Sequence, residues 1–206
     1  MKGLRATLRA LAILVVLALI AVAAAAYALT GRGLSARSAP SALEALVARA
    51  ARYLATPRGV RDRPNPVESS DAVFNEGIEH FADHCATCHA NDGSGDTAIG
   101  RNLYPRAPDM RAARTQSLSD GELFSIIENG VRLTGMPAWG NGTPESERAS
   151  WVLVHFIRRI PKLTPDQINR MKRLNPRTPA EFQAEEAAKA GKEPPPAPPH
   201  SHAHTH

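Results

Sequence analysis

An uncharged, mostly apolar run of 21 residues, from Ala10 to Thr30, dominates the start of the chain and follows three basic residues. As a helix this run would be about 31 Å long, close to the hydrocarbon thickness of a bilayer. We therefore expect residues 1–30 to be an N-terminal signal anchor that places the following chain outside the cytoplasm. A signal peptide cleaved near Ala26 is the alternative, but the length of the run favours the anchor.

A second pattern follows, in which apolar residues recur at helical spacing between residues 40 and 56. They are Leu43, Leu46, Val47, Ala50, Tyr53 and Leu54. This spacing predicts an amphipathic helix of about four turns within a basic linker, residues 31–67. A solvated spacer, docking on the rest of the chain and contact with anionic lipid headgroups all remain open. We favour a spacer that docks on the rest of the chain.

Three further helices are predicted between residues 68 and 161, which we expect to form one domain. The first runs from about Asp71 to His84, with Phe74 and Phe81 on its apolar face. The second covers residues 120–129, because Ser119 and Glu122 have the spacing of a capping box. The third starts after Thr143 and ends before Pro161. Apolar residues never alternate with period two over the length of a strand, so the predicted fold class is all-α.

The end of the chain contains two further kinds of segment. A helical extension is predicted over residues 162–191, because the Thr-Pro pairs at 164–165 and 178–179 are typical helix starts. Residues 192–206 are rich in proline and then in alternating histidines, at positions 200, 202, 204 and 206. Such a tail has no core-forming residues, but its imidazoles suit a soft divalent metal ion. Metal capture and a merely solubilising tail are both open.

Charge is unevenly distributed along the chain, whose net charge is +5. Residues 1–67 carry +8, residues 68–160 carry −5 and residues 161–206 carry +2. The basic excess therefore lies in the N-terminal arm, and the central domain has no basic stripe with interleaved aromatics. We expect no nucleic-acid partner.

The chemistry is concentrated at residues 85–89, Cys-Ala-Thr-Cys-His, which is the attachment pattern for c-type haem. The thiols of Cys85 and Cys88 can each add to a haem vinyl group, and His89 is then placed to ligate the iron. Three alternatives compete with this interpretation. A thioredoxin-like pair needs a βαβ context, and a disulfide would close a very small loop. A zinc site would combine the two cysteines with two of His80, His84, His89 and His155.

With this motif, residues 71–160 resemble a class I cytochrome c, a monohaem all-α electron carrier. In that family the helix before the motif crosses the last helix through a glycine and an aromatic residue, positions that Gly77 and Phe81 match. The resemblance implies a methionine as the second axial ligand, in a loop before the last helix, which Met136 fits. Met110 and Met171 are rivals placed less well in the chain. The resemblance also implies that a backbone carbonyl, from Pro105 or Pro108, contacts the imidazole of His89.

The function implied is transfer of single electrons by one covalent haem c per chain, with Cys85, Cys88, His89 and Met136 as cofactor-binding residues. His89 and Met136 would be the iron ligands, and thioether ligation raises the reduction potential. We expect an electron carrier rather than an enzyme, held by its N-terminal helix at a bacterial cytoplasmic membrane with the haem domain facing the periplasm. Its partners would be redox proteins. A haem-carrying subunit of a larger oxidoreductase complex is the main alternative, and peroxidase-like catalysis after loss of Met136 is a weaker one.

Overall fold

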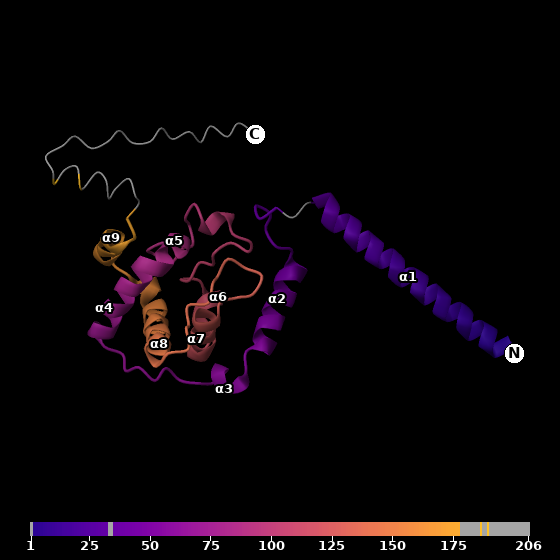
Figure 1. The fold of residues 1–206 in the computed structure, drawn as a ribbon, viewed down its shortest axis with the longest axis horizontal. Coiled ribbons are helices and arrows are strands. Elements are labelled where there is room, and N and C mark those ends of the chain that lie inside the picture. The colour runs from indigo at the N-terminus through magenta and orange to yellow at the C-terminus, as the bar shows by residue number, and fades with distance from the viewer. Residues whose placement is uncertain (1, 33–34, 178–185, 187–188, 190–206) are drawn as a thin grey trace.

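The computed structural model describes residues 2–32, 35–177, 186 and 189, and these residues form helices and loops without any strand (Figure 1). The all-α prediction is therefore confirmed. The helices are α1 (Lys2–Arg32), α2 (Ala42–Ala55), α3 (Arg58–Arg61), α4 (Asp71–His80), α5 (Ala86–His89), α6 (Ala113–Gln116), α7 (Asp120–Asn129), α8 (Pro144–Arg159) and α9 (Pro165–Leu174). A π-helical turn covers Phe81–Cys85, and 3-10 turns cover Gly100–Asn102 and Ile160–Lys162.

The core lies where α4 crosses α8, within a helical body formed by residues 71–174. Gly77 provides the space for this crossing, because a Cβ atom there would lie 2.7 Å from Cβ of Phe156. The ring of Phe156 also contacts Phe74 and Phe81, with centroids 5.9 and 4.8 Å apart. The predicted crossing through Gly77 and Phe81 is confirmed. It fixes the helix that carries the cysteine motif against the most buried part of the protein.

The helix starts follow the local capping rules. Ser119 and Glu122 form the predicted capping box of α7, and Gly130, with φ of 63°, ends that helix. The side chain of Thr143 caps α8, whose first residue is Pro144, and Thr164 caps α9 in the same way. Since each cap satisfies backbone N–H groups left free at a helix start, these short sequence signals set the helix boundaries.

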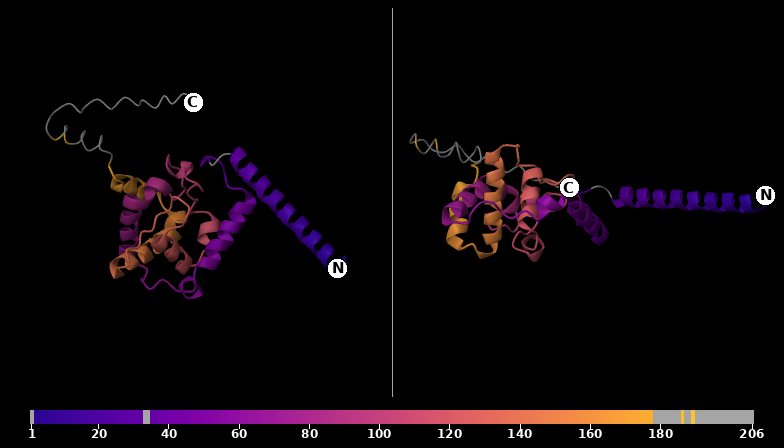
Figure 2. Two further views of the ribbon diagram at one scale, coloured as in Figure 1. Left: turned by 45° about the vertical axis from the view of Figure 1, so that its right-hand side comes forward. Right: turned by 90° about the horizontal axis from the view of Figure 1, so that it is seen from below.

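Helix α1 projects away from the rest of the molecule (Figures 1 and 2). Within its segment Arg5–Ala28, the most apolar stretch of 18 residues has a mean hydropathy of 2.8, and none of that stretch is buried within the protein. The helix is therefore long and apolar enough to cross a membrane. Signal sequences share this length and composition, so this feature is also compatible with cleavage.

The arm that we define as residues 42–67 packs on the helical body mainly through its second half. The amide of Asn65 donates to the carbonyl of Trp151 at 2.9 Å, and the carbonyl of Val67 lies 2.6 Å from Nε2 of His155. Helix α3 lies so close to α7 that a Cβ atom on Gly121 would be 1.9 Å from the carbonyl oxygen of Val60. The arm is therefore docked, but α2 itself has no buried residue.

Helix α9 packs back onto α4 and the π-helical turn. Met171 is fully buried, and Arg170 reaches Glu79 at 2.8 Å and Asn75 at 2.7 Å. The first part of the expected 162–191 extension thus belongs to the helical body. The second expected helix, from residue 178, lies outside the described residues except for Glu186 and Lys189, and the histidine tail lies wholly outside them.

Candidate functional site

The cysteine motif lies at the end of an almost continuous helical segment. Helix α4 starts at its cap Ser70, passes through the π-helical turn Phe81–Cys85 and ends in α5 at His89. A π turn inserts one extra residue per turn, and such turns are frequent at functional sites. Cys85 and Cys88 are half-buried free thiols. Burial, and secondarily the nearby Cys88, raises the pKa of the Cys85 thiol to about 12.

His89 is buried, with 8% of its surface exposed, and it packs beside Phe81. Burial lowers the pKa of its imidazole to about 4, and a weaker opposing effect comes from the backbone of Pro108. The contact with Pro108 does not reach full hydrogen-bond geometry, so Nδ1 remains a buried nitrogen without a partner. The ring is therefore neutral near pH 7, which is the form that ligates metals. Of the two prolines expected near this ring, the structure places Pro108 there.

The loop after the motif folds back over it and keeps the cysteine segment enclosed. The amide of Gly95 donates to the carbonyl of His89 at 2.9 Å, and Thr97 Oγ1 donates to that of Cys88 at 3.3 Å. Gly100 must be glycine here, because a Cβ atom would lie 2.2 Å from the Cys88 oxygen. Gly95, at φ of 72°, packs equally tightly against the carbonyl of Ala107. These contacts hold the segment around Pro108 beside His89.

Met136 lies in a loop that leaves the end of α7 and folds back onto it. The amides of Trp139 and Gly140 donate to the carbonyls of Ile127 and Glu128, at 3.1 and 3.0 Å, and so occupy groups left free at the helix end. Within the loop, Thr134 Oγ1 accepts from the amide of Met136 at 3.1 Å. The side chain of Met136 is half-buried. The loop is thus held in place while its methionine is not absorbed into the core.

The two rival methionines have other uses. Met171 is fully buried, and Met110, with 8% of its surface exposed, belongs to the same hydrophobic core. A methionine buried among apolar side chains has an ordinary packing role. Among the three methionines in the described residues, Met136 alone lies outside the core cluster, which supports the choice made from the sequence.

Some features of this region carry no recognisable sequence signal. Ala90, directly after His89, has φ of 60°, and Leu133, in the methionine loop, has φ of 63° and is 93% exposed. Non-glycine residues adopt such values rarely, and they tend to do so at functional sites. His84 contacts Trp139 edge to face, with centroids 5.4 Å apart, and so links the cysteine helix to the methionine loop.

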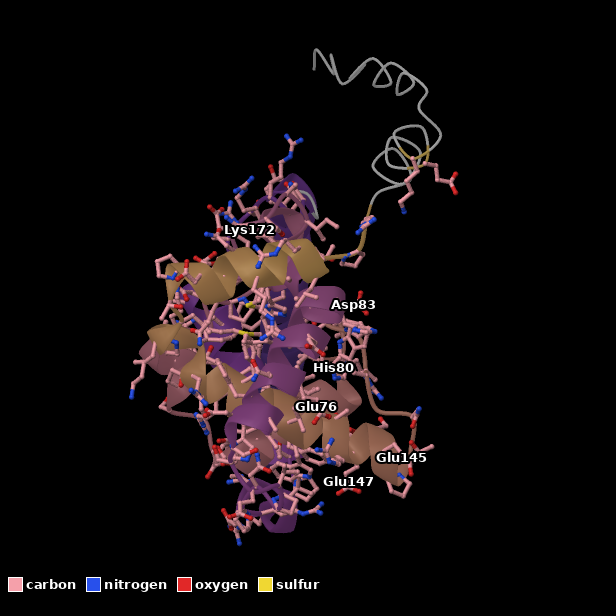
Figure 3. All side chains as sticks on the ribbon, turned by 90° about the vertical axis from the view of Figure 1, so that its left-hand side faces the viewer. Glu76, His80, Asp83, Glu145, Glu147 and Lys172 are labelled. Carbon is pink, nitrogen blue, oxygen red and sulfur yellow. The ribbon has the colours of Figure 1, made fainter. Side chains whose placement is uncertain are left out.

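The surface beside α4 is strongly charged. Glu76, His80 and Asp83 follow one edge of α4 and the π-helical turn, with Glu145 and Glu147 at the start of α8 on the same side (Figure 3). Burial, and then the charge of His84, lowers the pKa of His80. The Arg148 guanidinium holds the pKa of Glu76 below its ordinary value through a hydrogen bond. Glu76 is paired with Arg148 and Glu147 with Arg63, so this face carries charges of both signs.

The structure also bears on the alternative interpretations of the motif. Among the described residues, no group of three or more His, Cys, Asp and Glu side chains is arranged to hold a metal ion. The described part of the chain contains no βαβ unit, and the two thiols are not joined. What remains are two thiols three residues apart, a neutral buried imidazole and a thioether held in a fixed loop. This donor set fits a covalently bound haem.

A helical body in which the CxxCH-bearing helix crosses the last helix of the domain, with a methionine loop before that helix, defines a class I c-type cytochrome. Residues 72–157 match the family model described as cytochrome C oxidase, cbb3-type, subunit III. The match covers α4, the cysteine motif, the methionine loop and nearly all of α8, but not the N-terminal arm or α9. The chain therefore contains a cytochrome c domain, with haem as its cofactor and electron transfer as its function.

Proposed function

We propose that this protein is a membrane-anchored, monohaem c-type cytochrome that transfers single electrons between redox proteins at the outer face of a bacterial cytoplasmic membrane. Cys85 and Cys88 would hold haem c through thioethers, and His89 and Met136 would ligate its iron. The observation that carries the proposal is the position of the CxxCH motif. It ends a helix locked into the core at Gly77, and it buries a neutral His89. The contact of His84 with Trp139 links the same helix to the loop that carries Met136.

Haem c, when bound, supplies a one-electron ferric/ferrous couple. The residues of this chain hold it and exclude other ligands. His89 keeps its imidazole neutral through burial, and Pro108 faces the same ring from the loop that covers the motif. Met136 would offer the iron a soft sulfur ligand, which would favour the reduced state and raise the reduction potential. With the imidazole of His89 and the thioether of Met136 both bound, the iron would have no open site for oxygen or peroxide.

The ligand assignment is tested by replacing Met136 with leucine, which keeps the volume but removes the sulfur. We expect the reduction potential to fall and carbon monoxide to bind the reduced variant, whereas the native protein hardly responds to carbon monoxide. The matched control is Met171→Leu, which changes a core methionine and should leave both readouts unchanged. Strong carbon monoxide binding by the native protein would contradict His/Met ligation.

A second candidate function is that of a haem-carrying subunit in a larger membrane-associated oxidoreductase. The family model that matches residues 72–157 takes its description from an oxidase subunit, which favours this candidate. Gentle detergent extraction followed by native electrophoresis with haem staining distinguishes the two. A haem band of high mass that contains other proteins supports the subunit, and a band at the mass of the single chain supports the carrier.

The acidic balance of the cytochrome domain suggests the chemistry of the redox partners. With residues 68–160 carrying a charge of −5, we expect partners that present a basic patch. Such contacts gain their rate from long-range attraction and weaken as ionic strength rises. Electron transfer to a basic acceptor should therefore slow markedly with added salt.

A further inference from the structure

Helix α2 turns its apolar face away from the helical body. Leu43 is 70% exposed and Leu54 78%, and Leu46 and Val47 lie more than half in solvent. These positions, separated by three, four and seven residues, form one continuous stripe along the helix, which we call the α2 stripe. A stripe of this kind on an ordered helix is expected to be covered by something apolar.

The opposite face of α2 is the one that contacts the rest of the protein. Nη1 of Arg52 is buried, and Thr56, at the end of the helix, is 8% exposed. Glu44 accepts a hydrogen bond from the hydroxyl of Tyr104, in the loop that follows the cysteine motif. The polar side therefore faces the helical body, and the α2 stripe is directed outwards by the fold itself.

We infer that the α2 stripe lies in the headgroup region of the membrane that α1 crosses, so that α2 holds the haem domain against the lipid surface. This inference rests on the membrane anchoring that is part of the proposed function. Nine residues separate the end of α1 from Ala42, and they reach at most about 30 Å. Helix α2 also forms the edge of the molecule nearest α1 (Figure 1). The stripe is thus tethered close to a bilayer.

Charge favours a lipid surface as the occupant. Residues 33–67 contain six arginines and only two acidic residues. Arg49 and Arg58 are exposed on or directly after α2. Leucine and valine on one face with arginines beside them are the composition of helices that lie in a membrane interface, where basic side chains bind anionic headgroups.

A second copy of the chain fits the stripe less well. Helix α2 has 14 residues, so the stripe extends over about 21 Å. With a width of about 10 Å it would bury roughly 200 Å² on each partner, far less than the roughly 800 Å² per partner of a stable interface. A bilayer needs no such minimum area, because α1 already supplies the attachment.

The test uses the full haem-loaded chain with a protease site inserted after Leu34. The protein is reconstituted into vesicles of phosphatidylcholine, with or without phosphatidylglycerol, then cleaved and floated, and the haem absorbance of the floating fraction is measured. We expect the cleaved haem domain to stay with the vesicles and to do so more strongly when phosphatidylglycerol is present. The variant Leu43→Ser/Val47→Ser/Leu54→Ser should reduce the bound-to-free ratio at least tenfold.

The matched control, Ala42→Ser/Ala48→Ser/Ala55→Ser, places three serines at exposed positions of the same helix outside the stripe and should retain binding. Release of the cleaved native domain from both kinds of vesicle, as a monomer or as a dimer, would overturn the inference while leaving the α1 anchor intact. Failure of the uncleaved chain to float would overturn the anchor and this inference together.

Discussion

Helices α8 and α2 have similar amphipathic patterns, but the protein uses them in opposite ways. The apolar face of α8 is buried against α4 and α7, and seven of its residues are buried, among them Trp151 and Phe156. Helix α2 has no buried residue, and its leucines face outwards. Periodicity therefore identifies a face but not what covers it. In α8 the protein covers that face itself, whereas in α2 we assign it to the membrane.

The sharpest way to test this contrast is to remove one large apolar side chain from each helix. Phe156→Ala should cost about 3–5 kcal/mol of unfolding free energy, because it leaves a cavity at the α4–α8 crossing. Leu54→Ala should change it by less than about 0.5 kcal/mol, since the side chain is exposed. Denaturant unfolding of the two haem-loaded variants in detergent measures both values. Equal effects would mean that α2 is a core helix.

A pair of glycine substitutions, one in α4 and one in α3, should change the stability of the protein by less than Phe156→Ala and in different directions. Gly77→Ala should destabilise by about 1–3 kcal/mol, because the new Cβ atom would meet Phe156 at 2.7 Å. Gly59→Ala in α3 has open space around the new Cβ and should be neutral or slightly stabilising, as alanine favours helices. Thermal unfolding followed by circular dichroism compares them. A neutral Gly77→Ala would contradict the close crossing.

The junction between the arm and the helical body is tested by Gly121→Ala. A Cβ atom there would meet the Val60 carbonyl at 1.9 Å, so α3 must move away from α7. We expect the free energy of unfolding to fall by about 1 kcal/mol. This is the lower end of the usual cost of overpacking, because the arm can shift instead of the core. Limited proteolysis should cleave residues 57–67 faster than in the native protein. An unchanged cleavage rate would mean that the arm is not held at α7.

The smallest effect is expected at the surface pair of Glu76 and Arg148, which joins α4 to α8 at 3.0 Å. The pKa of the Glu76 carboxyl lies below its ordinary value of 4.5. The pair therefore contributes its stability above pH 4.5 and loses it as the pH falls through the pKa of Glu76 in the folded protein. Glu76→Gln should cost about 0.2–1 kcal/mol at pH 7. Denaturation at pH 7 and at pH 3 should show the difference shrinking in acid. A constant difference would exclude the charge as its cause.

Much of the fold could be predicted because its signals are local. The capping box at Ser119 and the Thr143-Pro144 start set helix boundaries through backbone groups within one turn. The π-helical turn before Cys85 and the positive φ of Ala90 could not be predicted, since they depend on how the cysteine segment packs under its loop. The orientation of α2 also escaped prediction. Its polar face docks through Glu44 and Arg52, and nothing in the periodicity says which face a neighbour will take.

For the candidate site, the motif identified Cys85, Cys88 and His89 directly, whereas Met136 depended on its position in the chain. The structure adds a physical reason for choosing it, because Met110 and Met171 are in the core and Met136 lies in a loop held by α7. The contact of His84 with Trp139 joins segments 55 residues apart in the sequence and had no local signal. Such long-range contacts require the fold.

Covalent attachment of haem tests the central claim most directly. The full chain is produced in a bacterial host that matures c-type cytochromes, denatured, separated on a gel and stained for haem, beside the variant Cys85→Ala/Cys88→Ala. The account predicts a stained band at the mass of the native chain, a c-type spectrum in alkaline pyridine and no stain in the double variant. A colourless native protein, or haem that leaves it on denaturation, would contradict it.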